Sequence, residues 1–505
     1  MLRLLDAPAM READNYTINS LGMPSMVLME RASLCVYEEI IKVADFTSQI
    51  GVLAGPGNNG GDAIAVARLL TVKGYNAFVY CPVLKEKMSK DELLQYEIAM
   101  NFGVSFVYDV EELYDCDILV DGLFGTGLTR DIDAPYDSLI DFVNTSDAYV
   151  ISIDIPSGLS ASTGRIRNKC VYADKTVAIA YIKIGEIVGY GAQYCGEIVV
   201  ADIGIETDFI ENFEHKYTLV EDDILNAFCF ERDVDSNKST CGKVLVIAGN
   251  DSMCGAAYLS ANAAFSAGAG MVRIYTRPAN KSSLNMLLPE AIVDCYETFD
   301  QVGLERLLSW STAVVIGPGF GTDELSEKIL DFVMHHAEVP VVIDADGINI
   351  LAKNLSWLAN RKAATILTPH NAEAARLCDV TYEKMASDSL SIISEFAKIY
   401  DATIVYKSHY SIIASRDHVY VVNAGSPALA TAGSGDVLSG IIGQLSGEFY
   451  DYEAGLVAAL GSYIHAKAGS VMADVLGVRG VKASDIVKGV NIVFSELETR
   501  EEEDD

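Results

Sequence analysis

Short apolar segments recur along this chain, and several of them run into a turn rich in glycine or carboxylates before a helical stretch begins. Strands alternating with helices predict sheets that are mostly parallel, with helices on both faces, so the expected fold class is α/β. The predicted strands are 49–54, 77–80, 117–120 and 148–153 in the first half, and 243–248, 271–275, 313–316, 339–344, 364–367 and 403–406 in the second.

A chain of 505 residues is too long for one hydrophobic core, so two large domains or three smaller ones are expected. A polar, acidic stretch places the boundary near 207–220. We predict domains at 1–214 and 215–500, followed by a solvated acidic tail at 501–505. Residues 13–43 are predicted to be helical because their apolar side chains follow helical spacing.

The net charge of the chain argues against some classes of binding partner. Lys and Arg number 37 against 71 Asp and Glu, which gives a net charge of −34 and argues against nucleic acid or an anionic membrane. An anionic ligand must then be held by local backbone dipoles and a few cations. Ten cysteines are scattered singly, no apolar run reaches a membrane span, and the first residues lack a signal-peptide pattern. A soluble cytoplasmic protein is expected.

A glycine-rich loop at 55–61 joins the predicted strand 49–54 to a predicted helix that starts at Asp62. The loop lacks the spacing of a dinucleotide fold and the Lys-Ser/Thr ending of a P-loop. Its adjacent Asn58 and Asn59 supply polar side chains that a plain turn rarely needs together. The alternative is an ordinary turn with Asp62 as the helix cap.

Two carboxylates follow predicted strands of the first half, Asp121 and Asp154. Ligands of an open α/β sheet bind beyond the carboxyl ends of its strands, so both are expected to converge with Asn58 and Asn59. Carboxylates that face one pocket repel each other unless a cation lies among them. Each aspartate alone is also a common turn former.

A second concentration of small residues, Gly433-Ser434-Gly435-Asp436, follows the strand-like segment 418–423. Glycines allow successive N–H groups to converge on an anion, and a helix that begins near Gly435 adds its positive end. A carboxylate beside a phosphate is unfavourable unless it takes a proton from a hydroxyl that attacks the phosphate. Asp436 is therefore a candidate base, and a helix cap is the alternative.

The motifs of the first half resemble those of the NAD(P)H-hydrate epimerase family. The resemblance rests on three segments, Gly55 to Asp62, Asp121 to Gly127 and Asp154 to Leu159, and it spans about residues 1–210. It implies a Rossmann-like three-layer sandwich, with Asp154 as the acid/base candidate. It also implies potassium ligands at Asn59, Asp121 and Ser157. The implied contacts to the hydrated nicotinamide are Asn58, Asn59, Gly60, Gly61, Asp62, Gly125, Thr126, Gly127, Leu128, Thr129, Arg130, Asp131 and Asp154.

The second half resembles the ADP/ATP-dependent NAD(P)H-hydrate dehydratase family, which has a ribokinase-like fold. This resemblance spans about residues 225–495. It rests on four segments: Gly317 to Gly321, Asp344 to Gly347, Thr368 to Glu373 and Gly433 to Asp436. It implies hydrate contacts at Ala256, Gly319, His370 and Asp436, and magnesium accompanying the nucleotide. His370 alone is also a plausible strand-end cap. The implied nucleotide contacts are Lys407, Ser408, His409, Tyr410, Ser411 and Gly435.

One departure concerns the nucleotide site. Members of the second family usually have Lys-Gly-Ala where this chain has Lys407-Ser408-His409. Losing the glycine restricts how closely the backbone approaches a phosphate or adenine. The fused two-domain form implies ADP as the nucleotide, and the departure leaves open whether ATP also serves.

Together the two resemblances imply an enzyme that repairs hydrated NADH and NADPH. The N-terminal domain would interconvert the epimers at C6, and the C-terminal domain would return the S epimer to the coenzyme with ADP. The expected partners are these small molecules, and the chain is expected to form a homo-oligomer. Two alternatives remain open: a ribokinase-like kinase of a vitamin-precursor alcohol, and a non-catalytic sensor of nicotinamide metabolites.

Overall fold

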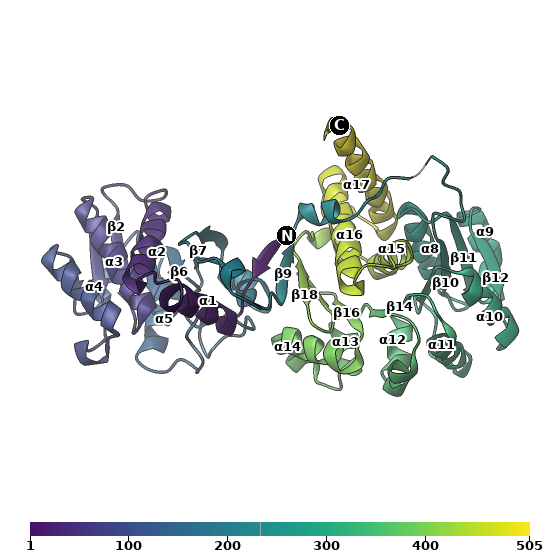
Figure 1. Cartoon of the computed structure of the whole chain (residues 1–505), viewed down its shortest axis with the longest axis horizontal. Coiled ribbons are helices and arrows are strands. Elements are labelled where there is room, and N and C mark those ends of the chain that lie inside the picture. The colour runs from purple at the N-terminus through teal and green to yellow at the C-terminus, as the bar shows by residue number, and fades with distance from the viewer. Residues whose placement is uncertain (233, 505) are drawn as a thin grey trace. The chain divides into compact units, whose positions relative to one another are not determined.

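The computed structural model describes residues 1–232 and 234–504, and it divides the chain into two compact units (Figure 1). One unit is Arg3–Lys216, and the other is Tyr217–Asp505 together with Met1–Leu2. Each unit has its own sheet, and the α/β class is confirmed. No helix among the described residues combines the length and apolar character that crossing a bilayer requires.

The N-terminal unit contains a seven-stranded sheet in the order β4-β3-β2-β5-β6-β7-β8, and every neighbouring pair is parallel. The short β1 (Leu2–Leu4) precedes it in the chain. The sheet strands are β2 (Gln49–Ala54), β3 (Asn76–Tyr80), β4 (Ser105–Val107), β5 (Ile118–Gly122), β6 (Tyr149–Ile153), β7 (Lys175–Ile179) and β8 (Glu197–Ala201). The helices are α1 (Ala7–Asn19), α2 (Ser25–Ile40), α3 (Asn58–Val72), α4 (Lys90–Asn101), α5 (Tyr136–Thr145), α6 (Ile184–Ile187) and α7 (Gly191–Tyr194).

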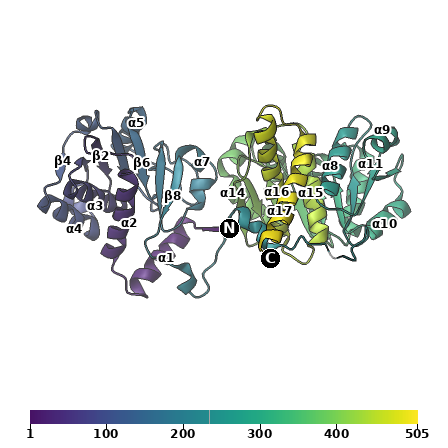
Figure 2. The same ribbon diagram turned by 90° about the horizontal axis from the view of Figure 1, so that it is seen from above.

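Successive residues of the central strands face opposite sides of this sheet and build two separate cores. Val52 and Val120 pack with α2 and α3, whereas Leu53 and Leu119 pack with α5. This alternation follows from the period of two along a strand. Figure 2 shows α2 and α3 on one side of the strands and α5 on the other. The unit is thus a three-layer sandwich.

Three local predictions for the N-terminal unit were wrong. The predicted helix 13–43 is two helices, because the chain takes φ 79° at Gly22 and α2 restarts after Pro24. Helix α3 begins at Asn58 rather than Asp62, because Gly57 (φ 96°) is its N-cap, so Asp62 is not the cap. Asp121 lies inside β5 rather than after it.

The C-terminal unit has a larger sheet in which ten strands follow the order β9-β18-β17-β16-β15-β14-β13-β10-β11-β12. All neighbours are parallel except β16–β17 and β17–β18. The strands are β9 (Tyr217–Val220), β10 (Lys243–Ile247), β11 (Met271–Thr276), β12 (Ile292–Cys295), β13 (Ala313–Ile316), β14 (Val341–Ile343), β15 (Thr365–Leu367), β16 (Thr403–Tyr406), β17 (Ser411–Ala414) and β18 (Val419–Val422).

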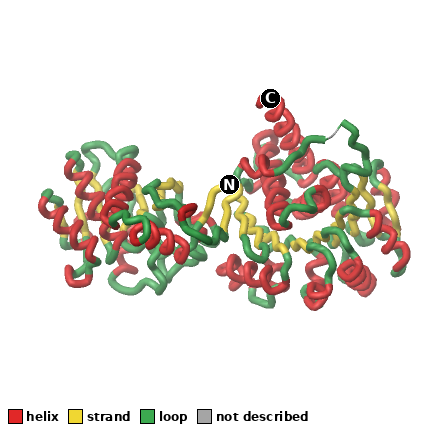
Figure 3. Tube along the Cα trace, in the orientation of Figure 1, coloured by secondary structure: helices red, strands yellow, loops and turns green. Residues whose placement is uncertain are grey.

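Helices cover both faces of this sheet, as the tube in Figure 3 shows for the red segments above and below the yellow strands. They are α8 (Cys254–Ser266), α9 (Lys281–Leu287), α10 (Gln301–Trp310), α11 (Glu324–His336), α12 (Asp346–Leu351), α13 (Asn371–Leu377), α14 (Tyr382–Tyr400), α15 (Ser434–Glu448), α16 (Ala454–Leu476) and α17 (Ala483–Asp504). Residues 501–504 continue α17, and the predicted solvation of the acidic tail concerns side chains outside the described residues.

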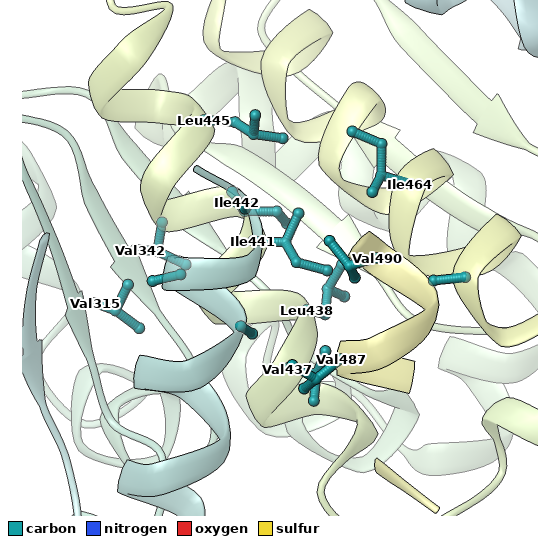
Figure 4. Close-up of a cluster of buried hydrophobic side chains, with 14 of the residues drawn as sticks. Val315, Val342, Val437, Leu438, Ile441, Ile442, Leu445, Ile464, Val487 and Val490 are labelled. Atoms are coloured by element: carbon teal, nitrogen blue, oxygen red, sulfur yellow. The ribbon is translucent and has the colours of Figure 1, made fainter. Parts of the chain in front are cut away.

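Helix α15 lies in the middle of the C-terminal core. Its Leu438, Ile441 and Leu445 are buried among Val315 and Val342 of the sheet and side chains of α16 and α17 (Figure 4). At Gly440 an added Cβ would lie 2.1 Å from the carbonyl oxygen of Ser260 in α8, so glycine is required for this close helix contact. Burial of the later turns of α15 fixes the position of its first turn.

Candidate active sites

A cavity of about 600 Å³ in the N-terminal unit brings together most of the residues predicted for the first site. Its walls come from α1, the start of α3, the segment 124–130 and the residue after β6. Gly60, Gly61 and Asp131 do not line it. An added Cβ on Gly60 would lie 1.7 Å from the oxygen of Gly55, so this glycine lets α3 approach the loop. The predicted residues that line the cavity are Asn58, Asn59, Asp62, Gly125, Thr126, Gly127, Leu128, Thr129, Arg130 and Asp154.

Asp154 is held at the floor of this first cavity by contacts on both carboxylate oxygens. It directly follows β6, in a left-handed conformation (φ 68°) that is unusual for a residue other than glycine. The N–H of Thr126 donates to Oδ2 at 3.1 Å, and the ammonium of Lys183 pairs with Oδ1. Lys183 is fully buried. The carboxylate is therefore oriented before any substrate binds.

Lys183 and its neighbour Glu186 were not predicted from the sequence. Glu186 lies in α6, is fully buried, and accepts a hydrogen bond from the N–H of Lys183. Burial raises the pKa of Glu186 to about 8. A single lysine after a strand belongs to no motif, so only its burial beside Asp154 reveals it.

Of the three predicted potassium ligands, Asn59 lines the first cavity, whereas Asp121 and Ser157 do not line it. The hydroxyl of Ser157 donates to Asp121 at 2.6 Å, and both side chains are fully buried. The buried amide of Asn59 has no hydrogen-bond partner among the described residues. Asn59 and Ser157 both lie against the segment 124–125. An unpartnered amide oxygen near a hydroxyl and a carboxylate is a donor set that suits a hard cation.

A second cavity, of about 690 Å³, lies in the C-terminal unit at the start of α15. Ala256, Gly319 and Tyr410 do not line it. Gly319 instead packs on α8, where an added Cβ would lie 3.0 Å from that of Ala256. The predicted residues that do line the cavity are His370, Lys407, Ser408, His409, Ser411, Gly435 and Asp436.

Asp436 lies in the first turn of α15, where Gly433 (φ 87°) is the N-cap. No side chain caps this helix, so the helix-cap alternative for Asp436 is wrong. Burial, reinforced by the charge of Asp344 and opposed by Lys407, raises the pKa of Asp436 to about 7. A carboxylate with this pKa exchanges protons readily near neutral pH.

Lys407 brings a positive charge to the same place. Its Nζ atom lies 3.0 Å from Oδ1 of Asp344, and an added Cβ on Gly435 would lie 3.2 Å from that Nζ. The hydroxyl of Thr368 also donates to Asp344, at 2.7 Å. A partly buried cation beside a helix N-terminus forms an anion site, and Asp436 borders it. Asp344 was not predicted as a site residue, although its strand-end motif was noted.

Three histidines line the second cavity: His370, His409 and His465. His370 is the N-cap of α13, where Nδ1 accepts from the N–H of Ala372 at 3.1 Å, so the cap alternative holds for this residue. His465 was not predicted, and its Nε2 lies 3.1 Å from the hydroxyl of Ser434. Burial lowers the pKa of His465 to about 4, so it is neutral at physiological pH. Neutral His465 therefore orients Ser434 without adding charge.

Comparison with known proteins agrees with two sites in two units. Residues 244–491 match the family described as NAD(P)H-hydrate dehydratase, and residues 25–185 match the YjeF-related protein N-terminus. The bifunctional NAD(P)H-hydrate repair enzyme of Moorella thermoacetica is 33% identical over 98% of this chain and 97% of its own.

This chain belongs to the bifunctional NAD(P)H-hydrate repair enzyme family. The family member of Coxiella burnetii is 31% identical over 96% of this chain and 98% of its own length. A ribokinase-like superfamily protein of Enterococcus faecalis matches with a TM-score of 0.50 and 27% identity, over 55% of this chain and 96% of that protein. The fold of the C-terminal unit is therefore ribokinase-like, as the family resemblance implied.

Proposed function

We propose that this protein repairs hydrated NADH and NADPH through two reactions, one in each unit. The N-terminal cavity exchanges the R and S epimers at C6, and the C-terminal cavity dehydrates the S epimer with ADP. The observation that carries the proposal is that each unit of this family member holds its own cavity with a differently placed carboxylate, Asp154 in one and Asp436 in the other. Family membership does not favour the kinase or sensor alternatives.

In the N-terminal cavity, Asp154 is the proposed proton-transfer group. Lys183 and the N–H of Thr126 leave the carboxylate no freedom to turn away from the cavity. The segment 125–131 with Asn58 to Asp62 is the proposed cradle of the hydrated nicotinamide nucleotide. Arg130 lines this cavity and brings a positive charge to it in a strongly acidic chain. Its guanidinium suits contact with the phosphates of the substrate.

In the C-terminal cavity, Asp436 removes the proton of the 6-hydroxyl, whose oxygen attacks the terminal phosphorus of ADP. The bond from that phosphorus to the bridging oxygen breaks, and AMP leaves. The N–H groups at 433–435 and the ammonium of Lys407 stabilise the charge that develops on the phosphoryl oxygens. The nitrogen lone pair then expels phosphate from C6, and loss of a proton from C5 yields NAD(P)H.

Two metal ions accompany the proposal. Asn59, Asp121 and Ser157 would hold a potassium ion, which supplies positive charge beside the anionic substrate. The unpartnered amide of Asn59 supports this assignment. Magnesium would enter with the nucleotide, because phosphate oxygens are its preferred ligands. We place the nucleotide along Lys407 to Ser411 and Gly435, and the hydrate beside His370 and Asp436; Ala256 and Gly319 lie outside the cavity lining.

We also propose that the protein is cytoplasmic and forms a homo-oligomer. The ten cysteines are free thiols, which suits the reducing cytoplasm. A homo-oligomer is expected, and light scattering of the purified protein measures its mass directly.

The test uses the full chain with an epimer mixture of NADPH hydrate and ADP, ATP or no nucleotide. We expect complete recovery of reduced-nicotinamide absorbance with ADP, together with free phosphate and AMP. A stable phosphorylated nicotinamide product with no recovered absorbance would contradict the dehydratase assignment and support a kinase. Epimer exchange without nucleotide, followed by chromatography, tests the first unit separately.

A further inference from the structure

Three side chains spaced four apart on α1 form one wall of the first cavity: Met10, Asp14 and Ile18. This spacing places them on one face of the helix. Asp14 is thus a carboxyl between two apolar neighbours, directed at the cavity. Its carboxyl makes no hydrogen bond or ion pair with any other residue that the structure describes. Asp14 is partly exposed and lines the cavity, so its carboxyl is accessible to a bound substrate.

The electrostatic surroundings of Asp14 and Asp154 differ. Burial, then the charge of Asp154, raises the pKa of Asp14 to about 6, and the charge of Lys183 opposes this rise. Asp154 is a carboxylate paired with the ammonium of Lys183. Two carboxyls that face one cavity from different environments can divide the roles of acid and base. The charged groups that border the cavity around Asp14 are Arg11, Asp62, Asp91, Arg130 and Asp154, with Lys183 behind Asp154.

We propose that Asp14 is the general acid of epimer exchange and acts on the ring nitrogen N1, while Asp154 acts as base on the 6-hydroxyl. The inference rests on the epimerase activity proposed above and adds a second catalytic residue to that site. The two carboxyls come from different elements: Asp14 lies on α1, and Asp154 directly follows β6.

The step balances without a cofactor. Asp154 takes the hydroxyl proton, the C6–N1 bond breaks as the C6 carbonyl forms, and N1 takes the proton of Asp14. Rotation about C5–C6 then presents the other face of the aldehyde. N1 attacks that face and returns its proton to Asp14, and the oxygen regains its proton from Asp154. The ring closes with C6 inverted, and both carboxyls regain their starting states.

Asp62 is the competing candidate, because it lines the same cavity. Burial, with the charges of Asp154 and Asp14, raises the pKa of Asp62 well above its usual value. Such a carboxyl stays protonated and donates a hydrogen bond, but it exchanges protons poorly near neutral pH. An effective acid has a pKa near the working pH. Asp14 meets this condition.

The experiment measures kcat and KM for epimer exchange from pH 5 to 9 in the full-length wild type, Asp14→Asn and Asp62→Asn. We expect the wild-type kcat/KM to fall tenfold per pH unit above about 6, as Asp14 of the free enzyme loses its proton. Asp14→Asn should lower kcat by about 10²–10⁴ and remove this fall, with KM changed only a few-fold. Asp62→Asn should raise KM and keep the pH dependence. Glu12→Gln, an exposed change on the same helix, should behave as the wild type.

Near wild-type kcat in Asp14→Asn, or a lowered kcat with the wild-type pH dependence, overturns the inference. Loss of the pH dependence in Asp62→Asn instead assigns the acid to Asp62. If Asp14→Asn does not fold, Asp14→Glu decides, because its pH dependence must move along the pH axis. Wild-type protein that does not speed exchange at all contradicts the proposed function itself, which is a separate result.

Discussion

The ammonium of Lys407 lies 3.0 Å from the carboxylate of Asp344, immediately beside the first turn of α15. Asp344 is 1% exposed; the ammonium of Lys407 balances its charge, and the Thr368 hydroxyl donates a hydrogen bond to it. The Lys407–Asp344 pair carries no net charge. Asp436, which lies next to it, therefore has no cation of its own among the described residues to balance its negative charge. Burial, and then the charge of Asp344, raises the pKa of Asp436 to about 7 although Lys407 opposes the rise.

The pH dependence of dehydration follows from that pKa. A base must be ionised, and the raised pKa means that Asp436 loses its proton only as the pH rises through about 7. The rate of dehydration of pure S hydrate should therefore rise tenfold per pH unit below 7 and level off above it. Stopped-flow absorbance from pH 5 to 9 measures this. A rate that is constant across the range would remove Asp436 from the role of base.

Replacing Lys407 by methionine should have two effects. The nucleotide loses a cation, so the KM for ADP should rise at least tenfold. The charge of Lys407 lowers the pKa of Asp436, so its loss should shift the rise of the pH profile toward alkaline pH. Lys398→Met, an exposed change on α14, is the matched control. An unshifted profile in Lys407→Met would show that the ammonium does not act on Asp436.

Asp154→Asn should abolish epimer exchange and leave dehydration of pure S hydrate unchanged. The amide retains the size of the carboxylate but cannot take a proton, and loss of a general base costs about 10²–10⁴ in rate. It also leaves the fully buried Lys183 without its ion-pair partner, so the folding of the variant is checked by circular dichroism. Exchange at the wild-type rate in a folded variant would exclude Asp154.

The fold was largely predictable because period and composition are local properties. Every predicted strand from 243 to 406 has a counterpart, and the parallel arrangement followed from the alternation with helices. The failures are positions where one residue overrides the pattern. Pro24 interrupts a continuous apolar periodicity, and Gly57 starts α3 four residues before the expected position.

The sites were predictable where glycines and carboxylates form motifs at strand ends. Lys183, His465 and Asp14 were missed because each is a single residue in an ordinary helix or turn, and only folding brings it to a cavity. Ala256 and Gly319 were expected at the hydrate; they lie next to each other and outside the lining of the second cavity. Such a contact depends on the distance between two elements, which sequence spacing does not give.

The C-terminal core gives a prediction about stability. Ile441 is fully buried on α15, and truncating it to alanine should lower the free energy of unfolding of this unit by about 2–5 kcal/mol. Chemical denaturation should be followed at the transition that added ADP shifts, because the two units can unfold separately. Val475→Ala, at an exposed position of α16, should change the free energy of unfolding by less than about 0.5 kcal/mol. Equal effects of both changes would contradict the packing around α15.

Complementation between two single variants tests the central claim, that separate carboxylates in separate units perform the two reactions. An equal mixture of R and S hydrates is given ADP and either Asp154→Asn, Asp436→Asn or both proteins together, and reduced-nicotinamide absorbance is followed. We predict that Asp154→Asn rapidly recovers only the S half, that Asp436→Asn recovers none, and that both proteins together recover all of it. Rapid full recovery by either variant alone would contradict the account.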